Sequence, residues 1–252
     1  MMKIIRNLLL KLLGFKGYLQ FVSFIYIRII NFGFLKEKYP ELFFLKKIIK
    51  PGFVCIDIGA NVGYYSHFLS KLAGKNGELY AVEPIPIFGK IWKKNVPQNF
   101  CKKTELLPFA LGSENTTVKM GTPVVRGVLH HGMTHIVNNN ENNIAQTFEV
   151  PMRIPDELFS ELTKVDFIKC DVEGYEQFVF ANLINTLTKH KPLVQSELSG
   201  AENRKFVISL FEELGYITCL LKNSCELIEA TIEEKINNTN DFYFVFDANK
   251  YL

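Results

Sequence analysis

The feature that most constrains the fold of this 252-residue chain is a short run, Val54-Cys55-Ile56-Asp57-Ile58-Gly59-Ala60-Asn61-Val62-Gly63. Its apolar start predicts a buried strand, its glycines predict a tight turn, and the residues from Tyr64 onward indicate a helix. A second apolar run, 79–82, ends in Glu83. In open α/β sheets this order of elements forms a nucleotide site, because small residues let the backbone approach the ligand and the acid accepts hydrogen bonds from ribose hydroxyls. The chain is therefore expected to bind an adenosine-containing cofactor.

The spacing within the turn favours one class of cofactor over another. A dinucleotide site uses the pattern G-x-G-x-x-G, whereas this chain has Asp57-x-Gly59-x-Asn61-x-Gly63. Asn61 stands where the middle glycine would be, and the anion of Asp57 would repel a pyrophosphate. An acid suits a cofactor with a cationic amino-acid end, because neighbouring opposite charges favour each other's charged form. S-adenosylmethionine has such an end and is the favoured cofactor; a nucleotide-dependent oxidoreductase is the alternative.

Acidic residues also follow the later predicted strands. Asp171 and Glu173 come at the end of the apolar run 165–171, and Glu197 lies near the end of the run 193–198. Because ligands bind beyond the carboxyl ends of the strands in open α/β sheets, we expect these acids at the reacting end of the cofactor. Such carboxylates serve as a general base or hold a divalent cation. The alternative role for Asp171 is to cap the helix that follows.

The pattern of apolar runs and turns predicts one α/β domain over residues 51–252, with a seven-stranded, mostly parallel sheet, an antiparallel end and helices on both faces. Residues 116–153 predict a β-hairpin insertion that bears His130, His131 and His135. His130 or His131 is either a second-choice base or an ordinary polar loop residue. The predicted strands are 53–58, 79–83, 105–111, 165–171, 193–198, 216–221 and 241–246, with a loop or hairpin between the last two.

The N-terminal extension, residues 1–50, differs in charge from the rest of the chain. It carries 10 Lys and Arg against 2 Glu, a net charge of +8, whereas residues 51–252 carry 19 basic and 24 acidic residues. Residues 1–15 have the spacing of an amphipathic helix, and the apolar run 18–35 contains Arg28, a charge that is costly at a bilayer centre. No signal-peptide cleavage site follows. The extension is expected either to lie on an anionic inner membrane face through residues 1–35 or to cover an edge of the sheet.

The five cysteines favour a cytoplasmic protein without a zinc site. Their number is odd and they form no C-x-x-C pair, so free and buried thiols are expected. Cys170 raises the alternative of a nucleic-acid methyltransferase that uses a cysteine nucleophile. The two-residue period of a strand, however, places Cys170 on the face opposite Asp171, and residues 51–252 are acidic rather than basic. We therefore expect no nucleic-acid partner.

Five motifs occur in one order along the chain. They are Ile56-Asp57-Ile58-Gly59-Ala60-Asn61-Val62-Gly63, Val82-Glu83-Pro84, Ala110-Leu111-Gly112, Asp166-Phe167-Ile168-Lys169-Cys170-Asp171-Val172-Glu173-Gly174-Tyr175-Glu176 and Ser196-Glu197-Leu198. In these motifs, over roughly residues 50–200, the chain resembles the FkbM-type family of S-adenosylmethionine-dependent methyltransferases. The resemblance implies a class I methyltransferase (Rossmann-like) fold. It departs from the family at Ile154-Pro155-Asp156, where Thr-Leu-Asp is common, and residues 1–50 carry no part of it.

The resemblance also implies an activity and a role for individual residues. The activity is O-methylation of a hydroxyl on a sugar, a glycan precursor of the surface-polysaccharide type or a natural product, with Asp171 as the first candidate base and Glu173 and Glu197 next. A divalent metal is compatible with this activity but is not required for it. A non-catalytic, membrane-peripheral cofactor-binding protein is a further alternative, which the intact motifs disfavour. The residues that would hold the cofactor are Asp57, Gly59, Ala60, Asn61 and Gly63 at its methionine end, Glu83 at the ribose, and Ala110 and Leu111 at the adenine.

Overall fold

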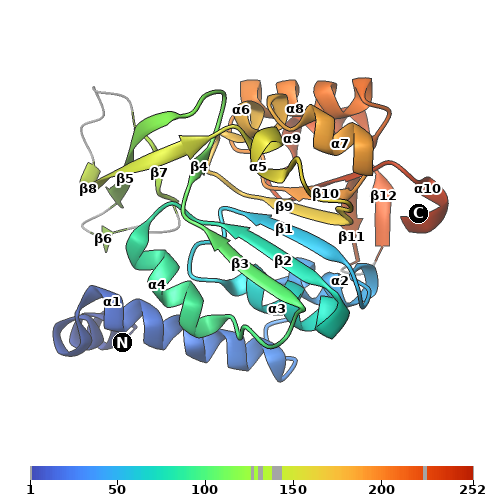
Figure 1. Ribbon diagram of the computed structural model, residues 1–252. Helices are drawn as coiled ribbons and strands as arrows, with labels where there is room; N and C mark the ends of the chain where they lie inside the picture. Colours follow the sequence, from blue (N-terminus) through green and yellow to red (C-terminus); the bar gives the residue numbers. More distant parts are fainter. Residues whose placement is uncertain (1, 126–127, 130–132, 138–143, 224–225, 252) are drawn as a thin grey trace.

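The centre of the protein is a sheet of eight strands in the order β12-β11-β13-β10-β9-β1-β2-β3 (Figure 1). The structure is a computed structural model, and it describes residues 2–125, 128–129, 133–137, 144–223 and 226–251. The strands from β3 to β10 run parallel, and β13, β11 and β12 extend the sheet antiparallel. The predicted α/β fold with an antiparallel end is thus confirmed. The strands are β1 (Val54–Ile58), β2 (Glu78–Val82), β3 (Lys103–Leu107), β9 (Phe167–Cys170), β10 (Leu193–Ser196), β11 (Ile217–Lys222), β12 (Glu226–Glu229) and β13 (Phe242–Val245).

Helices cover both faces of this sheet (Figure 1). Side chains alternate along each strand, so Cys55 of β1 packs into the core of one face and Ile56 into the core of the other. Because both faces are buried, the parallel strands are nearly continuous apolar runs, which is why they were visible in the sequence. One face carries α2 (Pro40–Ile48), α3 (Tyr64–Ala73) and α4 (Pro86–Asn95), and the other carries α5 (Pro155–Phe159), α6 (Glu176–Ala181), α7 (Ile184–His190) and α8 (Ala201–Glu213).

Short helical elements complete the fold around the main sheet. A 3₁₀ turn, Gly74–Asn76, follows α3; α9 (Ile232–Asn237) packs on α8; and α10 (Ala248–Tyr251) ends the described chain. The eighth strand, β12, was not among the seven predicted. It pairs antiparallel with β11, in the interval where the sequence suggested a loop or hairpin.

The predicted single strand over residues 105–111 is wrong, because the chain changes sheets there. β3 ends before Pro108, which has no N–H to donate to a ladder, and Ala110–Leu111 forms β4 of a second sheet. In that sheet β4 pairs with β8 (Ile144–Arg153), which pairs antiparallel with β5 (Thr116–Val125). Two short strands, β6 (Val128–Leu129) and β7 (His135–Ile136), also pair with β5. His130 and His131 lie outside the described residues.

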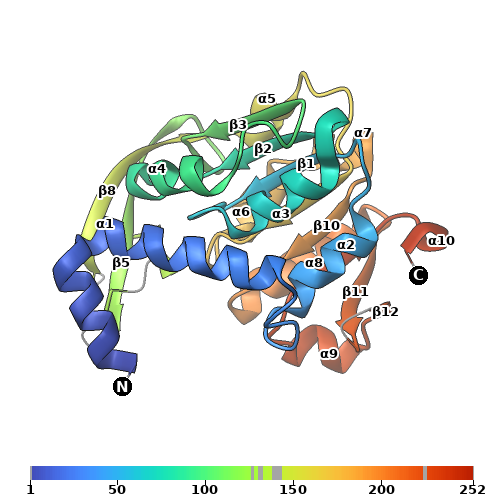
Figure 2. The ribbon, with the colours of Figure 1, turned by 90° about the horizontal axis from the view of Figure 1, so that it is seen from below.

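The N-terminal helix α1 (Met2–Asn31) forms an outer layer of the protein. It consists of two helical segments that meet at a kink at Gly14, whose φ of 65° and ψ of 173° are not helical, close to the boundary expected between residues 15 and 18. It packs on α4 and α3 rather than on an edge of the sheet (Figure 2). α2, in contrast, places Phe44 and Leu45 in the core beside the sheet. The two helices of the extension are therefore built into the fold in different ways.

The cysteines within the described residues, Cys55, Cys101, Cys170 and Cys219, are buried and free, and Cys225 lies outside them. Burial raises the pKa of the Cys170 thiol well above its usual value. Cys170 packs with Ile56 and Ile168 in the core of the α6–α8 face. It is a structural residue, as its position in the strand predicted.

Candidate active site

A cavity of about 980 Å³ lies at the carboxyl ends of β1, β2, β9 and β10. Its volume is at the upper end of the range usual for small-molecule sites, about 300–1,000 Å³. Gly63 is not among the residues that line it. This glycine directly precedes α3 with φ 92°, and an added Cβ there would meet Val96 at 2.9 Å and Trp92 at 3.0 Å. Ten residues proposed from the sequence line the cavity: Asp57, Gly59, Ala60, Asn61, Glu83, Ala110, Leu111, Asp171, Glu173 and Glu197.

The turn between β1 and α3 is held tightly against the end of β9. Gly59 has φ 80°, and a Cβ at this position would overlap the backbone carbonyl oxygen of Asp171. The N–H groups of Gly59 and Ala60 both donate to the carbonyl oxygen of Val82, each at 3.0 Å. Only glycine combines this φ with so close an approach of two backbones. The turn therefore places bare backbone in the cavity wall.

Glu83 connects this turn to the loop after β2. It is 5% exposed, and its two carboxylate oxygens accept hydrogen bonds from the backbone N–H of Asn61 at 2.8 Å and of Ile85 at 2.7 Å. Burial raises its pKa to about 7, although both N–H donors act in the opposite direction. Each oxygen keeps a second lone pair, so the proposed ribose contact is compatible with these bonds.

Asp57 is buried on the α3 side of β1. It is 1% exposed and accepts a hydrogen bond from the hydroxyl of Ser66, which accepts one from the indole N–H of Trp92 at 2.7 Å. Burial raises the pKa of Asp57 to about 6, while the hydrogen bond from Ser66 and the charge of Lys169 counteract the shift. The carboxylate therefore has a structural role in joining β1 to α3 and α4, as well as a place in the cavity wall.

Lys169 is a cavity residue that the sequence analysis did not single out. It is 2% exposed, its Nζ lies 3.3 Å from a carboxylate oxygen of Asp171, and it lies 4.9 Å from the centre of the Tyr65 ring. Burial alone would lower its pKa, but the surrounding carboxylates of Asp171, Asp241 and Asp57 raise it above the usual value. The sequence did carry a signal for this residue: a lysine stands within the apolar run of β9, and a buried lysine needs a partner.

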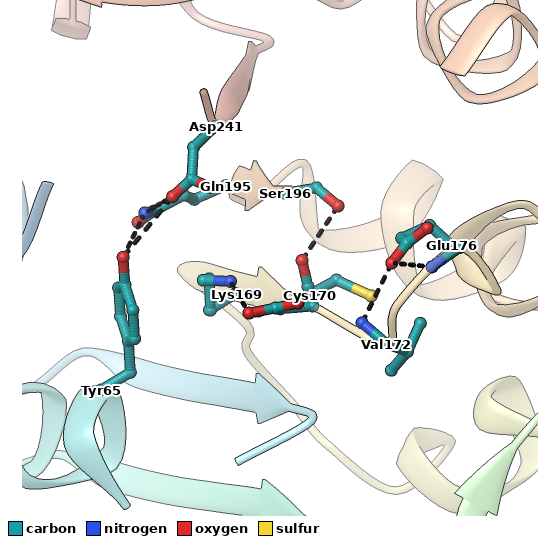
Figure 3. A network of polar contacts seen from close by, with 10 residues as sticks. Tyr65, Lys169, Cys170, Val172, Glu176, Gln195, Ser196 and Asp241 are labelled. Carbon is teal, nitrogen blue, oxygen red and sulfur yellow. Dashed lines mark hydrogen bonds and ion pairs between the residues drawn. The ribbon is translucent and has the colours of Figure 1, made fainter. Parts of the chain in front are cut away.

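Neighbouring strands surround Lys169 with polar groups (Figure 3). The register of the sheet puts Asp57 and Gln195 directly beside it on β1 and β10. The Gln195 side-chain amide donates to the Tyr65 hydroxyl at 3.0 Å and to Asp241, and the Tyr65 hydroxyl donates to Asp241 at 3.5 Å. This chain of contacts fixes the side of the cavity that lies next to α2.

Further carboxylates give this part of the cavity an acidic wall. Partial burial and the charges of Asp171 and Glu197 raise the pKa of Glu173 to about 7. The pKa of Glu197 rises for similar reasons, and that of Glu41, from α2, rises to about 7 through burial and the charge of Asp241. Groups with such values exchange protons near neutral pH, as general acids and bases do. Glu41 also shows that the N-terminal extension contributes to the cavity.

Glu176 anchors the loop that carries Asp171 and Glu173. Its side chain is 0% exposed and accepts a hydrogen bond from the N–H group of Val172 at 3.0 Å (Figure 3). It also accepts hydrogen bonds from the N–H group of Gly174 at 3.2 Å and from the amide of Asn203 at 2.6 Å. Glu173 has φ 55°, a conformation that is unfavourable for a residue with a Cβ. The Glu176 carboxylate is what holds the loop in this shape.

We expect Glu176→Ala to lower the free energy of unfolding by about 3 kcal/mol, because it leaves the buried Asn203 amide and the partly buried N–H groups of Val172 and Gly174 without their acceptor, at about 1–3 kcal/mol for a buried group. Urea denaturation of the purified variant measures the change. Glu202→Ala on the exposed start of α8 is the matched control and should change the stability by less than about 0.5 kcal/mol. Equal stability of the two variants would show that Glu176 does not anchor the loop.

The side chains of the site were also compared with the requirements of a metal centre. Within the part of the chain that the structure describes, no cluster of three or more His, Cys, Asp or Glu side chains is arranged to hold a metal ion. Asp171 instead has an ammonium group, that of Lys169, as its near partner.

Comparison with known proteins identifies the family to which this chain belongs. The family model described as the methyltransferase FkbM domain matches residues 57–218, which is more than half of the chain and includes the Gly59 turn, Asp171 and Glu173. The chain belongs to the FkbM methyltransferase family. This confirms the resemblance found in the motifs and makes the protein an S-adenosylmethionine-dependent methyltransferase by family and fold, in preference to the oxidoreductase alternative. No curated protein matches the chain.

Solved structures with a similar arrangement are distant from this FkbM-family methyltransferase in sequence. Methyltransferase FkbM from Methylobacillus flagellatus KT is 15% identical with a TM-score of 0.49; the match covers 82% of this chain and 47%, about half, of that one. Precorrin-6y C5,15-methyltransferase from Geobacter metallireducens GS-15 is 15% identical with a TM-score of 0.46 and coverages of 83% and 87%. Aeropyrum pernix fibrillarin, crystallised with bound S-adenosyl-L-methionine, is 12% identical with a TM-score of 0.43 and coverages of 78% and 67%.

The cavity of this FkbM-family methyltransferase fits S-adenosylmethionine by the chemistry of its walls. The Gly59 turn places bare backbone in the cavity wall, and Asp57 offers a carboxylate for a cationic amino-acid end. Glu83 has acceptor capacity for ribose hydroxyls, and Ala110 and Leu111 provide an apolar wall. These residues would hold the cofactor; their individual roles are predictions.

Proposed function

We propose that this FkbM-family protein methylates a hydroxyl oxygen of a neutral, hydroxyl-rich acceptor, such as a sugar of a glycan precursor. The observation that supports this is the acidic wall beside Lys169, where Glu41, Asp171, Glu173 and Asp241 all line the cavity. Carboxylates accept hydrogen bonds from hydroxyl groups and repel phosphate and carboxylate groups. The same repulsion disfavours the backbone of a nucleic acid.

In the proposed reaction the bound cofactor supplies an electrophilic methyl group on a sulfonium. Asp171 accepts the proton of the acceptor hydroxyl as the oxygen becomes the nucleophile. The Lys169 ammonium, 3.3 Å from Asp171, holds the carboxylate in place. Glu173 and Glu197, whose pKa values are raised, pass the proton on toward solvent. The cavity walls hold the two reactants in contact, which contributes much of the rate in a transfer of this kind.

The proposal is tested by incubating the full chain with S-adenosylmethionine labelled in its methyl group and with matched pools of neutral sugars, amino sugars and sugar phosphates. We expect label in a neutral sugar, in a linkage that survives mild base, because an ether does and an ester does not. Label on nitrogen, on carbon or in a base-labile ester would contradict O-methylation. Preference for the sugar phosphates would contradict the role given to the acidic wall.

The raised pKa of Asp57 gives the cofactor affinity a pH dependence. The ionised carboxylate favours the cationic end of S-adenosylmethionine and the protonated acid does not, so binding weakens as the pH falls below the pKa of about 6. At pH 5 such a group is about one-tenth ionised, so the affinity should be about tenfold lower than at pH 7. Calorimetric titration at the two pH values measures this difference. Equal affinities, or the same dependence in Asp57→Asn, would show that Asp57 does not contact the cation.

A further inference from the structure

The kinked helix α1 presents different side chains to three surroundings. Its inner face is buried on α3 and α4 through Leu19, Ser23, Ile27 and Ile30. Specific hydrogen bonds fix this face: the Asn95 amide donates to the Ser23 hydroxyl at 2.8 Å, and Lys71 donates to Asn31 at 2.7 Å. A flank with Val22 and Tyr26 lines the cavity. The inner face and this flank therefore belong to the folded enzyme.

The outer face of α1 is apolar and uncovered. Among the described elements, none packs against this side of the helix, which forms the outside of the molecule (Figures 1 and 2). Phe21, Phe24 and Ile25 recur at helical spacing on α1, and Phe32 and Phe34 follow in the turn directly after the helix. Their exposed fractions reach 45% for Phe21, 44% for Phe24 and 78% for Phe32. Contiguous apolar surface of this kind marks an interaction site.

Charge indicates the nature of the partner. Exposed basic residues lie along α1 and the segment after it, among them Lys11, Lys16, Arg28 and Lys36. The Arg28 guanidinium lies 4.4 Å from the centre of the Phe24 ring, so charge and aromatic surface occur together on the outer face. With a net charge of +8 over residues 1–50, two copies of this surface would repel each other. An anionic partner with an apolar interior satisfies both features.

The contacts of α1 also indicate whether this helix would lie on a bilayer or cross it. The segment Leu8–Asn31 is long and apolar enough to span a membrane, with a mean hydropathy of 1.4. A spanning helix, however, would remove Ser23 and Asn31 from the hydrogen bonds described above and place Lys16 in the hydrocarbon region. A helix that keeps these contacts can bury only its outer face in the lipid headgroup region.

We propose that the outer face of α1 docks this protein on the surface of an anionic lipid bilayer, with the helix lying in the membrane plane. The aromatic side chains enter the interface between headgroups and acyl chains, and the basic residues contact the anionic headgroups. Since Val22 and Tyr26 line the cavity from the flank of the same helix, docking brings the cavity beside the membrane. The proposal stands on α1 alone and does not depend on the acceptor or on the reaction.

Flotation of the full chain with lipid vesicles tests the docking. We expect binding to vesicles with about 30% phosphatidylglycerol, and binding weaker by about tenfold or more in Phe24→Ser/Phe32→Ser, which removes one exposed aromatic side chain from the outer face of α1 and one from the turn after it. Pure phosphatidylcholine vesicles and high salt should also weaken binding, because the basic residues then lose their partner. The matched control is Ile184→Ser/Phe206→Ser, two exposed apolar residues on helices of the opposite face of the sheet, which should bind as the wild type does.

Several results would overturn the docking proposal. They are absence of wild-type binding to the anionic vesicles, equal binding by Phe24→Ser/Phe32→Ser, and a dimer in size-exclusion chromatography that this variant dissociates, since a second copy would then be the partner. Titration with S-adenosylmethionine accompanies each variant. Unchanged cofactor affinity shows that the variant is folded, and it keeps a failure of docking separate from a failure of the proposed reaction.

Discussion

Gly59→Ala should weaken S-adenosylmethionine binding by about 100-fold or more, equivalent to about 2.7 kcal/mol. The added Cβ would overlap the carbonyl oxygen of Asp171, and neither partner is a flexible side chain that can rotate away. The turn must therefore move off the end of β9, and its backbone leaves the position proposed to contact the cofactor. The φ of 80° adds strain of about 1–3 kcal/mol for any residue with a Cβ. Calorimetric titration of the purified variant measures the loss.

Gly52→Ala is the control that separates the effect of the overlap with Asp171 from the effect of backbone strain at a positive φ. Gly52 has φ 88°, but a Cβ there would meet nothing within 4 Å, and it does not line the cavity. This control should lose stability and keep its cofactor affinity within about threefold, equivalent to about 0.7 kcal/mol. If Gly59→Ala bound the cofactor as well as Gly52→Ala did, the turn would not be part of the cofactor site. A melting temperature for each variant shows whether the protein under titration is folded.

Asp171→Asn should lower turnover by about 100-fold or more while leaving S-adenosylmethionine affinity close to that of the wild type, because an amide cannot take the proton of the acceptor hydroxyl. The substitution preserves the shape of the side chain. Lys169 keeps Asp57 and Asp241 as neighbouring carboxylates, so the cavity is not left with an isolated buried charge. The rate of S-adenosylhomocysteine formation with the acceptor identified from the sugar pools measures turnover, and calorimetry measures affinity.

The two readouts together distinguish a proton acceptor from a structural residue. Asp247→Asn, on the exposed surface after β13, is the control and should leave both unchanged. Wild-type turnover in Asp171→Asn would exclude Asp171 as the base. Loss of cofactor affinity in parallel with turnover would assign Asp171 to cofactor binding or to support of the Gly59 turn, which its carbonyl oxygen touches.

The convergence of Asp57, Gly59, Glu83 and Asp171 could be predicted because it follows from a general property of parallel sheets. The carboxyl ends of neighbouring parallel strands meet at one edge, so motifs that end such strands come together whatever the sequence between them. The motif order then identified the family. The β3–β4 break was missed because residues 105–111 read as one apolar run, although Pro108 was the signal.

The polar surroundings of Lys169 were beyond sequence reasoning for a different reason. Tyr65, Gln195 and Asp241 come from three separate elements, and which of them face Lys169 depends on the order and register of β9, β10 and β13. Two-residue periodicity gives the face of a side chain but not its neighbour on the next strand. Glu41 was missed because the packing of α2 beside the sheet has no local sequence signal. These contacts shape the acceptor side of the cavity, so the acceptor is the part of the function that sequence constrains least.

The most direct test of the central claim is calorimetric titration of the full chain with S-adenosylmethionine and, separately, with NADH. We expect micromolar binding of S-adenosylmethionine that is lost in Glu83→Ala, whose side chain ties the Gly59–Asn61 turn to the loop after β2, and no comparable binding of NADH. Preference for NADH, or failure of the folded wild type to bind S-adenosylmethionine, would contradict the assignment of this cavity to a methyltransferase.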